Sequence, residues 1–309
     1  MSEASSVEIW LWLQMVMSPH NPKTALILSQ FDNNAKAAAE AVRDGEIQFL
    51  SDDEKRRASE IRSGAVNSVI AVCEEQNIDI ITLDDERYPR LLRNIENPPV
   101  VLFCAGDISG LDEKFTLSVV GTRFASDYGY SVTKSLVSSL AKLGCVITSG
   151  LAVGLDTAAH KACLDAGGRT IGVCGCGIMV DYPKGHGDLK RKIVEQGGAV
   201  ISELLPFTKP SGSYFQHRNR IISGLSLGTL VLEAGESSGC LLTVQHALEQ
   251  GREIFAVPPH NILNARFAGT SALIRDGAVP VFSYIDIVRT LMKNGSLTDY
   301  FRTALGENK

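Results

Sequence analysis

The sequence predicts an α/β protein with a mostly parallel β-sheet and helices on both faces, preceded by a small all-helical segment. Short apolar runs rich in β-branched residues alternate with longer amphipathic stretches from Leu117 to Phe282, a pattern typical of right-handed βαβ units. Before residue 76 the apolar residues follow helical spacing only. A chain of 309 residues is long enough for one large domain and a small one.

Residues 1–75 are expected to form the helical domain. Trp10, Leu13 and Met17 recur at the intervals of one helix face. The segment 18–22 contains two prolines, so the first helix should end there. No pattern in this part suggests chemistry, and we expect it to have a packing or partner-binding role.

Residues 76–290 are expected to form the sheet domain, and residues 291–309 a C-terminal tail. Asp79–Leu83 and Val100–Phe103 have the composition of strands. The regular alternation follows, with one of its helices expected at 129–143. The later strands are expected at Leu117–Gly121, Cys145–Ser149, Arg169–Cys174, Ala199–Glu203, Thr229–Glu233, Glu253–Val257 and Val279–Phe282.

The net charge of −5 is unevenly distributed along the chain. Residues 1–87 hold 16 acidic and 8 basic side chains, whereas the other 222 residues hold 19 acidic and 22 basic ones. The net charge is thus −8 in the first part and +3 in the second. An anionic partner such as nucleic acid is therefore compatible with the second part.

The cysteine pattern and the first apolar run both favour a cytoplasmic protein. Seven cysteines, an odd number, include no Cys-x-x-Cys pair, which predicts reduced thiols rather than disulfides or metal ligands. The run Ile9–Met17 is short and follows Glu3 and Glu8 rather than basic residues. It fits neither a signal peptide nor a membrane span. We expect no membrane association, no metal and no cofactor.

Three turns directly follow strand-like runs and combine glycine with polar side chains. They are Gly121-Thr122-Arg123, Ser149-Gly150 and Gly175-Cys176-Gly177. In an open parallel sheet such turns gather at one edge, where ligands bind. Glycine lets the backbone approach a ligand, and hydroxyl and guanidinium groups donate to phosphate. The turns therefore predict one polyanion-binding surface.

A further cluster lies at Arg218-Asn219-Arg220, which is expected to open a helix. The partial positive charge of a helix N-terminus would assist these anion donors. Phe215 stands just before them and is an equal candidate for stacking on a base or for packing in the core. Lys184 would add a cation at the same sheet edge.

The sequence gives little support to an enzyme. It contains neither a dinucleotide-binding Gly-x-Gly-x-x-Gly nor a P-loop. Asp156, His160, Glu203 and Glu233 are the candidates for acid–base chemistry. Asp156 could equally cap the helix that holds His160, and the two glutamates could equally receive arginines. Without a nucleophile–base pair or a metal-binding spacing, we expect no catalysis.

Taken in order, these motifs resemble the bacterial DNA-processing protein A (DprA/Smf) family from about Tyr88 to Val288. The matching segments include Tyr88-Pro89, Gly121-Thr122-Arg123, Ser149-Gly150 through Asp156 to His160, Tyr182-Pro183-Lys184, Arg218-Asn219-Arg220, Ser238-Gly239 and Gln250 to Pro258. Their common order and spacing make this resemblance specific.

The resemblance implies a SAM-like helical domain followed by an extended Rossmann-like domain that holds single-stranded DNA. It also implies protection of that DNA and loading of the RecA recombinase during natural transformation. It adds Gly239 to the candidate site. The expected single-stranded-DNA-binding residues are Gly121, Thr122, Arg123, Ser149, Gly150, Lys184, Phe215, Arg218, Asn219 and Gly239.

The alternative is a nucleotide-monophosphate hydrolase of the lysine-decarboxylase-like (LOG) type, which uses a similar sheet edge. That family carries a Pro-Gly-Gly-x-Gly-Thr-x-x-Glu motif, whereas this chain has only Gly228-Thr-Leu-Val-Leu-Glu233. The difference favours the DNA-binding interpretation.

The segment Ala247–Leu291 carries more apolar residues than one sheet edge needs. Much of it should be core, and an apolar remainder on the outside would form a two-fold interface. The resemblance implies dimerisation through the same region. We therefore expect a homodimer that involves the helix at 285–291.

Overall fold

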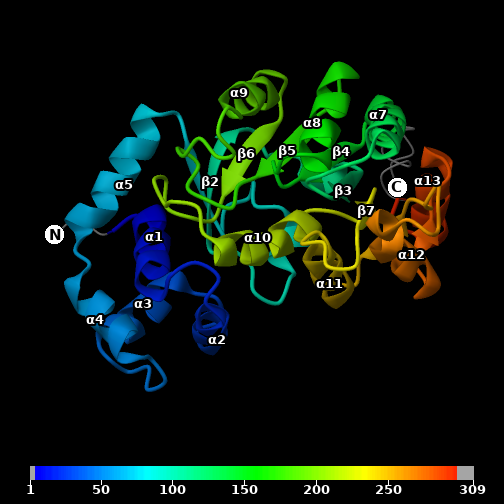
Figure 1. Ribbon diagram of the computed structural model, residues 1–309. Helices are drawn as coiled ribbons and strands as arrows, with labels where there is room; N and C mark the ends of the chain where they lie inside the picture. Colours follow the sequence, from blue (N-terminus) through cyan, green and yellow to red (C-terminus); the bar gives the residue numbers. More distant parts are fainter. Residues whose placement is uncertain (1–3, 298–309) are drawn as a thin grey trace, which may run out of the picture.

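The structure, a computed structural model, describes residues 4–297 of the chain. It contains a nine-stranded sheet flanked by helices and preceded by a helical region (Figure 1). The predicted fold class is confirmed. The expected C-terminal tail is only partly covered, because residues 298–309 lie outside the described part and residues 291–293 belong to the last helix.

The helical region is built around its first helix. That helix begins at a capping box in which Ser5 and Glu8 bond to each other's backbone amides. Trp10, Leu13 and Met17 are buried, as their spacing predicts. The region consists of α1 (Ser6–Met17), α2 (Pro22–Gln30), α3 (Ala35–Arg43), α4 (Asp52–Glu60) and α5 (Ser63–Glu75).

The sheet has the order β1-β2-β6-β5-β4-β3-β7-β8-β9. From β6 to β9 all neighbours are parallel, whereas β2 pairs antiparallel with both β1 and β6. The expected strands are all present, with ends that differ by a few residues. They are β1 (Asp79–Thr82), β2 (Val101–Gly106), β3 (Thr116–Val120), β4 (Val146–Ser149), β5 (Thr170–Val173), β6 (Ala199–Ser202), β7 (Gly228–Val231), β8 (Glu253–Ala256) and β9 (Val279–Pro280).

Helices cover both faces of the sheet (Figure 1). Helices α7, α8 and α13 share one hydrophobic cluster with the strands, and α10 and α11 share another. Leu117 and Val119 of β3 belong to the first cluster, and Val120 to the second, as the alternation of a strand requires. The helices are α6 (Arg90–Arg93), α7 (Asp127–Lys142), α8 (Leu155–Asp165), α9 (Gly187–Glu195), α10 (Gly212–Gly224), α11 (Leu241–Glu249), α12 (Ala268–Arg275) and α13 (Tyr284–Lys293), with short 3-10 turns η1 (Leu111–Glu113) and η2 (Ala265–Phe267).

The helical region and the sheet share a hydrophobic core. One cluster joins the buried side of α1 to Val101 and Phe103 of β2 and to Ile193 of α9. A buried hydrogen bond of 2.9 Å runs from Nε2 of Gln14 to the carbonyl oxygen of Glu203. The helical region is therefore packed firmly on the β2–β6 side of the sheet.

The two outer strands of the sheet differ from the central ones. β1 packs against α1 and α5, so helices lie beside this edge. β9 pairs with β8 through only Val279 and Pro280. Within residues 4–297, no helix combines the length and the apolar character needed to cross a membrane.

Candidate functional site

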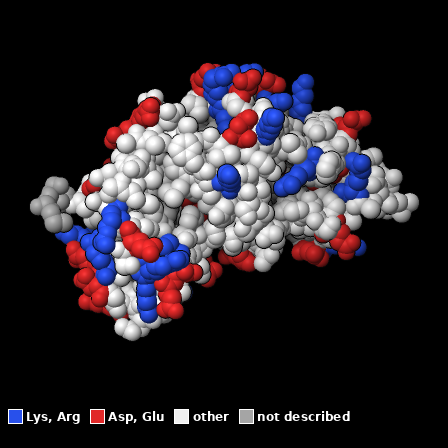
Figure 2. Space-filling view, turned by 60° about the vertical axis from the view of Figure 1, so that its left-hand side comes forward, with Lys and Arg blue, Asp and Glu red and all other residues white. Residues whose placement is uncertain are grey.

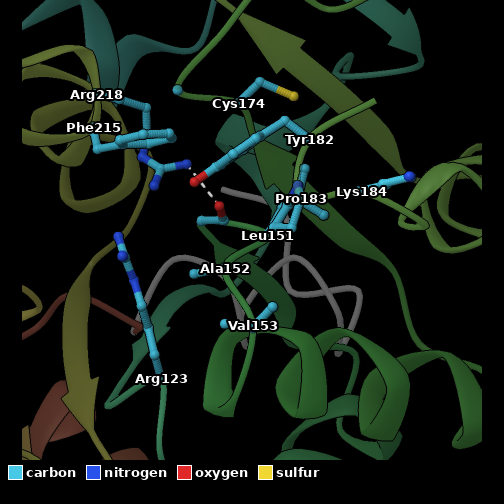
Figure 3. Close-up of a pocket in the computed structure, with 12 residues that line it drawn as sticks. Arg123, Leu151, Ala152, Val153, Cys174, Tyr182, Pro183, Lys184, Phe215 and Arg218 are labelled. Atoms are coloured by element: carbon cyan, nitrogen blue, oxygen red, sulfur yellow. Dashed lines mark hydrogen bonds between the residues drawn. The ribbon is translucent and has the colours of Figure 1, made fainter. Parts of the chain in front are cut away.

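A pocket of about 130 Å³ opens where β3, β4 and β5 end (Figure 3). It brings together five residues singled out in the sequence, namely Arg123, Gly150, Lys184, Phe215 and Arg218. Leu151, Ala152, Val153, Cys174, Gly175, Tyr182 and Pro183 complete its lining. The pocket thus combines cations, glycine turns and aromatic rings from segments far apart in the sequence.

Two exposed cations stand at the pocket, Arg123 from the turn after β3 and Lys184 from the segment after β5. Neither forms an ion pair with a carboxylate in the described part of the chain. Figure 2 shows charges of both signs crowded over the helical region at lower left, whereas the middle of that face carries isolated basic side chains on a largely uncharged surface. Both cations are free to bind an anion.

Two glycines allow the turns after β3 and β4 to touch. Gly154 has a φ of +85°, and a Cβ there would lie 2.5 Å from the carbonyl oxygen of Thr122. A Cβ on Gly121 would lie 2.5 Å from Cδ1 of Leu155. The amide of Leu155 donates to the Thr122 oxygen over 3.2 Å. These glycines are required for contact between the two turns.

Asp156 holds the same two turns from inside. Its Oδ2 accepts from the amide of Gly150 at 3.1 Å, and its carboxylate also accepts from the amides of Ala152 and Gly121. Burial raises the pKa of Asp156 to about 6, although Arg218 and these amides oppose the rise. The amides of Gly121 and Gly150 therefore point to a carboxylate of the protein itself. The sequence signal for this role is an aspartate six residues after Gly150, a position from which it could equally cap the helix that follows.

Arg218 does not stand at a helix N-terminus, and that expectation was wrong. Helix α10 begins at Gly212, which places Arg218 in its second turn with an exposed fraction of 7%. Its Nη1 donates to the carbonyl oxygen of Gly150 at 2.7 Å and also to that of Val173. Arg218 thus ties the turns after β4 and β5 to α10 (Figure 3).

Phe215 lies in the first turn of α10 and is half-buried between two neighbours. The ring of Tyr182 stacks on it, with centroids 5.1 Å apart and planes inclined by 30°. A Cβ on Gly175 would lie 2.3 Å from Cδ1 of Phe215, so the ring packs directly on this glycine. Tyr182 therefore belongs to the aromatic surface. In the sequence, the feature that could have identified Tyr182 is its position two residues before Lys184.

The other candidate residues do not line the pocket. Oγ of Ser149 donates to the carbonyl oxygen of Val119 at 2.7 Å inside the sheet. Oδ1 of Asn219 accepts from Nε of Arg218 at 3.3 Å, and Oγ1 of Thr122 accepts from the amide of Phe124 at 3.2 Å. Gly121 and Gly239 are also outside the lining, Gly239 in an exposed turn before α11.

The carboxylates considered for catalysis have structural partners. Glu203 forms a buried ion pair of 2.6 Å with Arg220, which removes Arg220 from the candidate anion donors. Glu233 is fully buried and accepts from the amide and, at 2.6 Å, from Oγ of Ser126. Nδ1 of His160 lies 2.7 Å from Oγ1 of Thr170. These carboxylates hold helices and strands in place.

The cysteines are free thiols in this structure, six of them buried. Within residues 4–297, no group of three or more histidine, cysteine, aspartate or glutamate side chains is arranged to hold a metal ion.

Known proteins resemble this chain over most of its length. The DNA processing protein DprA of Bacillus subtilis (strain 168) is 41% identical over 223 residues, which cover 72% of this chain and 74% of that protein. Protein Smf of Escherichia coli (strain K12) is 41% identical over 227 residues, which cover 74% of this chain but only 60% of that longer protein.

Two solved structures share the fold. The X-ray structure of DprA from Streptococcus pneumoniae superposes with a TM-score of 0.79 at 32% identity and covers 93% of this chain and 98% of that chain. DprA from Helicobacter pylori, whose structure concerns its single-stranded-DNA-binding mode, gives a TM-score of 0.62 at 28% identity and covers 70% of this chain and 96% of that chain. The family model described as DNA recombination-mediator protein A matches residues 79–292. This chain therefore belongs to the DNA recombination-mediator protein A family.

Proposed function

We propose that this protein binds single-stranded DNA at the pocket between the turns after β3, β4 and β5. The observation that carries the proposal is the pair of unpaired cations, Arg123 and Lys184, beside the stacked rings of Phe215 and Tyr182. Cations with adjacent aromatic rings suit a flexible strand, which presents phosphates and unstacked bases together. The single-stranded-DNA-binding mode reported for the Helicobacter pylori relative supports the same function.

In this proposal the residues of the pocket have two kinds of role. Arg123 and Lys184 contact phosphates, and the exposed parts of the aromatic pair contact bases. Arg218 and Asp156 position the turns, because their polar atoms bond to backbone groups of Gly150, Val173 and Ala152. Gly121, Thr122, Ser149, Asn219 and Gly239 would then act by shaping the backbone around the pocket. Contacts to phosphate and to ring faces give little preference for base sequence.

A titration of labelled oligothymidylate, a mixed-sequence strand and the corresponding duplex tests this function. The two single strands should bind within about tenfold of each other, a difference of roughly 1.4 kcal/mol, and more tightly than the duplex. Equal or tighter binding of the duplex would contradict the proposal.

We propose that the protein is not an enzyme. Leu232 stands where the hydrolase motif has its glutamate, and the neighbouring Glu233 is fully buried and bonded to Ser126. A carboxylate so enclosed cannot reach a nucleotide without unfolding the start of α7. Incubation with AMP and IMP should leave both intact. Release of a free base, lost in Glu233→Gln, would establish the hydrolase instead.

We further propose that the protein acts as a cytoplasmic homodimer that delivers single-stranded DNA to the RecA recombinase during DNA uptake. The RecA partnership rests on the description of the family as recombination mediators. The dimer rests on exposed apolar side chains from the segment before α12 and from the start of α13, two helices at one end of the molecule (Figure 1). Leu263 and Phe282 are 90% and 79% exposed there, and Ile262 and Ile285 are exposed as well. Exposed apolar residues that recur in these segments suit a self-complementary interface.

A further inference from the structure

The wall of the pocket contains a pair of cysteines that the proposed DNA binding does not use. Cys174 and Cys176 follow β5 and flank Gly175. Both side chains are buried, and each thiol perturbs the pKa of the other. Of the two, only Cys174 lines the pocket (Figure 3). Cys174 is therefore the cysteine of the pair that is nearer to a small molecule in the pocket.

The surroundings favour the thiolate of Cys174 over that of Cys176. The neighbouring Cys176 thiol lowers the pKa of Cys174, and the positive charges of Lys190 and Arg218 act in the same direction against the effect of burial. The pKa of Cys176 is raised, first by the neighbouring Cys174 thiol and then by burial. Burial also raises the pKa of Cys73 and of Cys240 to about 11. A thiolate is the reactive form of cysteine, so Cys174 is the favoured nucleophile among these thiols.

We propose that Cys174 and Cys176 form a peroxide-sensitive dithiol that closes to a disulfide and disables the pocket. The Cys174 thiolate attacks one oxygen of hydrogen peroxide, the O–O bond breaks, and hydroxide leaves. The resulting sulfenic acid is attacked by the sulfur of Cys176, whose proton is taken up by the leaving oxygen as water. Two thiols and one peroxide thus give one disulfide and two waters, and an added dithiol such as dithiothreitol reverses the change.

Disulfide closure would reach the pocket through Gly175. A disulfide holds its two Cβ atoms about 3.8 Å apart in a restricted geometry, so the Cys174-Gly175-Cys176 turn must tighten. Gly175 packs so closely on Phe215 that no Cβ fits between them. The carbonyl oxygen of Val173, one residue before Cys174, accepts a hydrogen bond from Nη1 of Arg218. A tighter turn therefore displaces both the aromatic ring and the arginine that positions the turn after β4.

Peptide mapping tests the disulfide independently of DNA. Trypsin releases residues 170–184, which contain Cys174 and Cys176 and no other cysteine. After treatment with hydrogen peroxide this peptide should lose two hydrogen atoms in mass, resist alkylation, and return to its original mass with dithiothreitol. Cys240→Ser should behave like the unmodified protein, whereas Cys176→Ala should trap an oxygen on Cys174. A reduced, alkylatable peptide after treatment, or one that carries only added oxygen in the unmodified protein, would overturn the proposal.

The effect on the pocket rests on the proposed DNA binding and is measured separately. Oxidised protein should bind oligothymidylate about tenfold or more weakly than reduced protein, and bound oligothymidylate should slow disulfide formation by covering Cys174. If reduced protein fails to bind, the proposed function is wrong, while the mapping still decides the chemistry. If oxidised and reduced protein bind equally although the disulfide has formed, the proposed control of the pocket is wrong. Cys176→Ala should keep its affinity after the same treatment better than Cys240→Ser.

Discussion

At the scale of single residues, the basic side chains near the site are of two kinds. Some form no ion pair within the described residues, and others are bonded to carbonyl oxygens or to a carboxylate. Arg123 and Lys184 are exposed and form no ion pair within the described residues. Arg218 is buried, with hydrogen bonds to two carbonyl oxygens, and Arg220 is paired with Glu203. Only Arg123 and Lys184 can bind a phosphate without first breaking a hydrogen bond or an ion pair within the protein. The sequence presents all four alike, and the difference is set by which backbone oxygens and carboxylates the fold brings to each guanidinium.

Replacing the free cations should reduce both the affinity for single-stranded DNA and its dependence on salt. Each phosphate contact to a single strand contributes about 0.7 to the slope of log affinity against log salt concentration. Arg123→Ala and Lys184→Ala should each lower that slope by about this amount, as fluorescence titrations at several salt concentrations would show. Arg123→Lys should recover part of the affinity, since it restores the charge but not the planar fork.

The control for these variants is Arg191→Ala. Arg191 is an exposed cation on α9 that pairs with Asp188 on its own helix, and its loss should leave the slope unchanged. Slopes that are the same in all the alanine variants would place the DNA elsewhere on the surface.

At the scale of elements, the turns after β3 and β4 form one unit because Gly154 permits their contact. Its φ of +85° and the carbonyl oxygens of Thr122 and Arg123, 2.5 and 2.6 Å from an added Cβ, exclude a side chain. The unit places Arg123 on one side of the pocket and the Gly150–Val153 backbone on another. The placement of the cation thus depends on a residue that has no functional group.

Gly154→Ala should destabilise the protein and weaken DNA binding more than Gly167→Ala does. Gly167 has a φ of +75°, but a Cβ there meets no atom within 4 Å. Its replacement should cost only the backbone term of about 1 kcal/mol, whereas Gly154→Ala adds overlap with backbone oxygens and should cost at least about 3 kcal/mol. Urea unfolding and oligothymidylate titration of both variants measure the difference. Equal losses of stability would mean that the turns separate easily.

The helices and strands could be predicted from the sequence better than the contacts between them. The apolar run at 117–121 identifies β3 because both faces of a central parallel strand are buried. The start of α10 was misplaced, since Gly212, Ser213 and Tyr214 lack the apolar spacing of a helix and belong to it through tertiary packing. The use of the Gly121 and Gly150 amides by Asp156 depends on two turns meeting in space. The local sequence pattern of either turn does not show that the two turns come into contact.

At the scale of the whole molecule, the helical region and α10 meet at a pair of histidines. The ring of His20 stacks on that of His217 with centroids 3.9 Å apart and planes inclined by 10°. Burial lowers the pKa of His20 to about 4 against the attraction of Glu203, and it also lowers the pKa of His217. Both rings are therefore held neutral where the helical region contacts the helix that carries Phe215.

Stability should fall as the pH decreases from 6.5 towards 4. A histidine whose folded-state pKa is depressed binds fewer protons in the folded state than in the unfolded state across that window, so acidification favours unfolding. For half-buried His20 the loss between pH 7 and pH 5 should be at most about 2 kcal/mol after screening by solvent. Urea unfolding at the two pH values measures it.

His20→Asn should reduce this pH dependence, since asparagine tolerates the φ of 55° at this position and does not titrate. His260→Asn, at the other end of the molecule beside Tyr128 and Phe267, should leave it in place. A pH dependence that survives in His20→Asn and disappears in His260→Asn would contradict this assignment.

The proposed dimer makes a separate prediction at this scale. Phe282→Glu or Ile285→Lys places a charge in the exposed patch and should give a folded monomer by light scattering, with weaker binding to long DNA because two linked pockets no longer act together. Leu248→Lys alters an equally apolar, 62% exposed position on α11 and should remain dimeric. An unmodified protein that is monomeric at tens of micromolar would rule the dimer out.

The form of the sheet edges also limits how many copies can join. Pro280 lacks an amide hydrogen, β9 has only two residues, and β1 packs against α1 and α5. Neither edge is a template for a strand from another molecule, which is the usual route to open-ended fibres. Association through side chains on a self-complementary patch stops at two copies. A long DNA strand that binds this protein would therefore carry separate dimers, and not one polymer joined through its sheet edges.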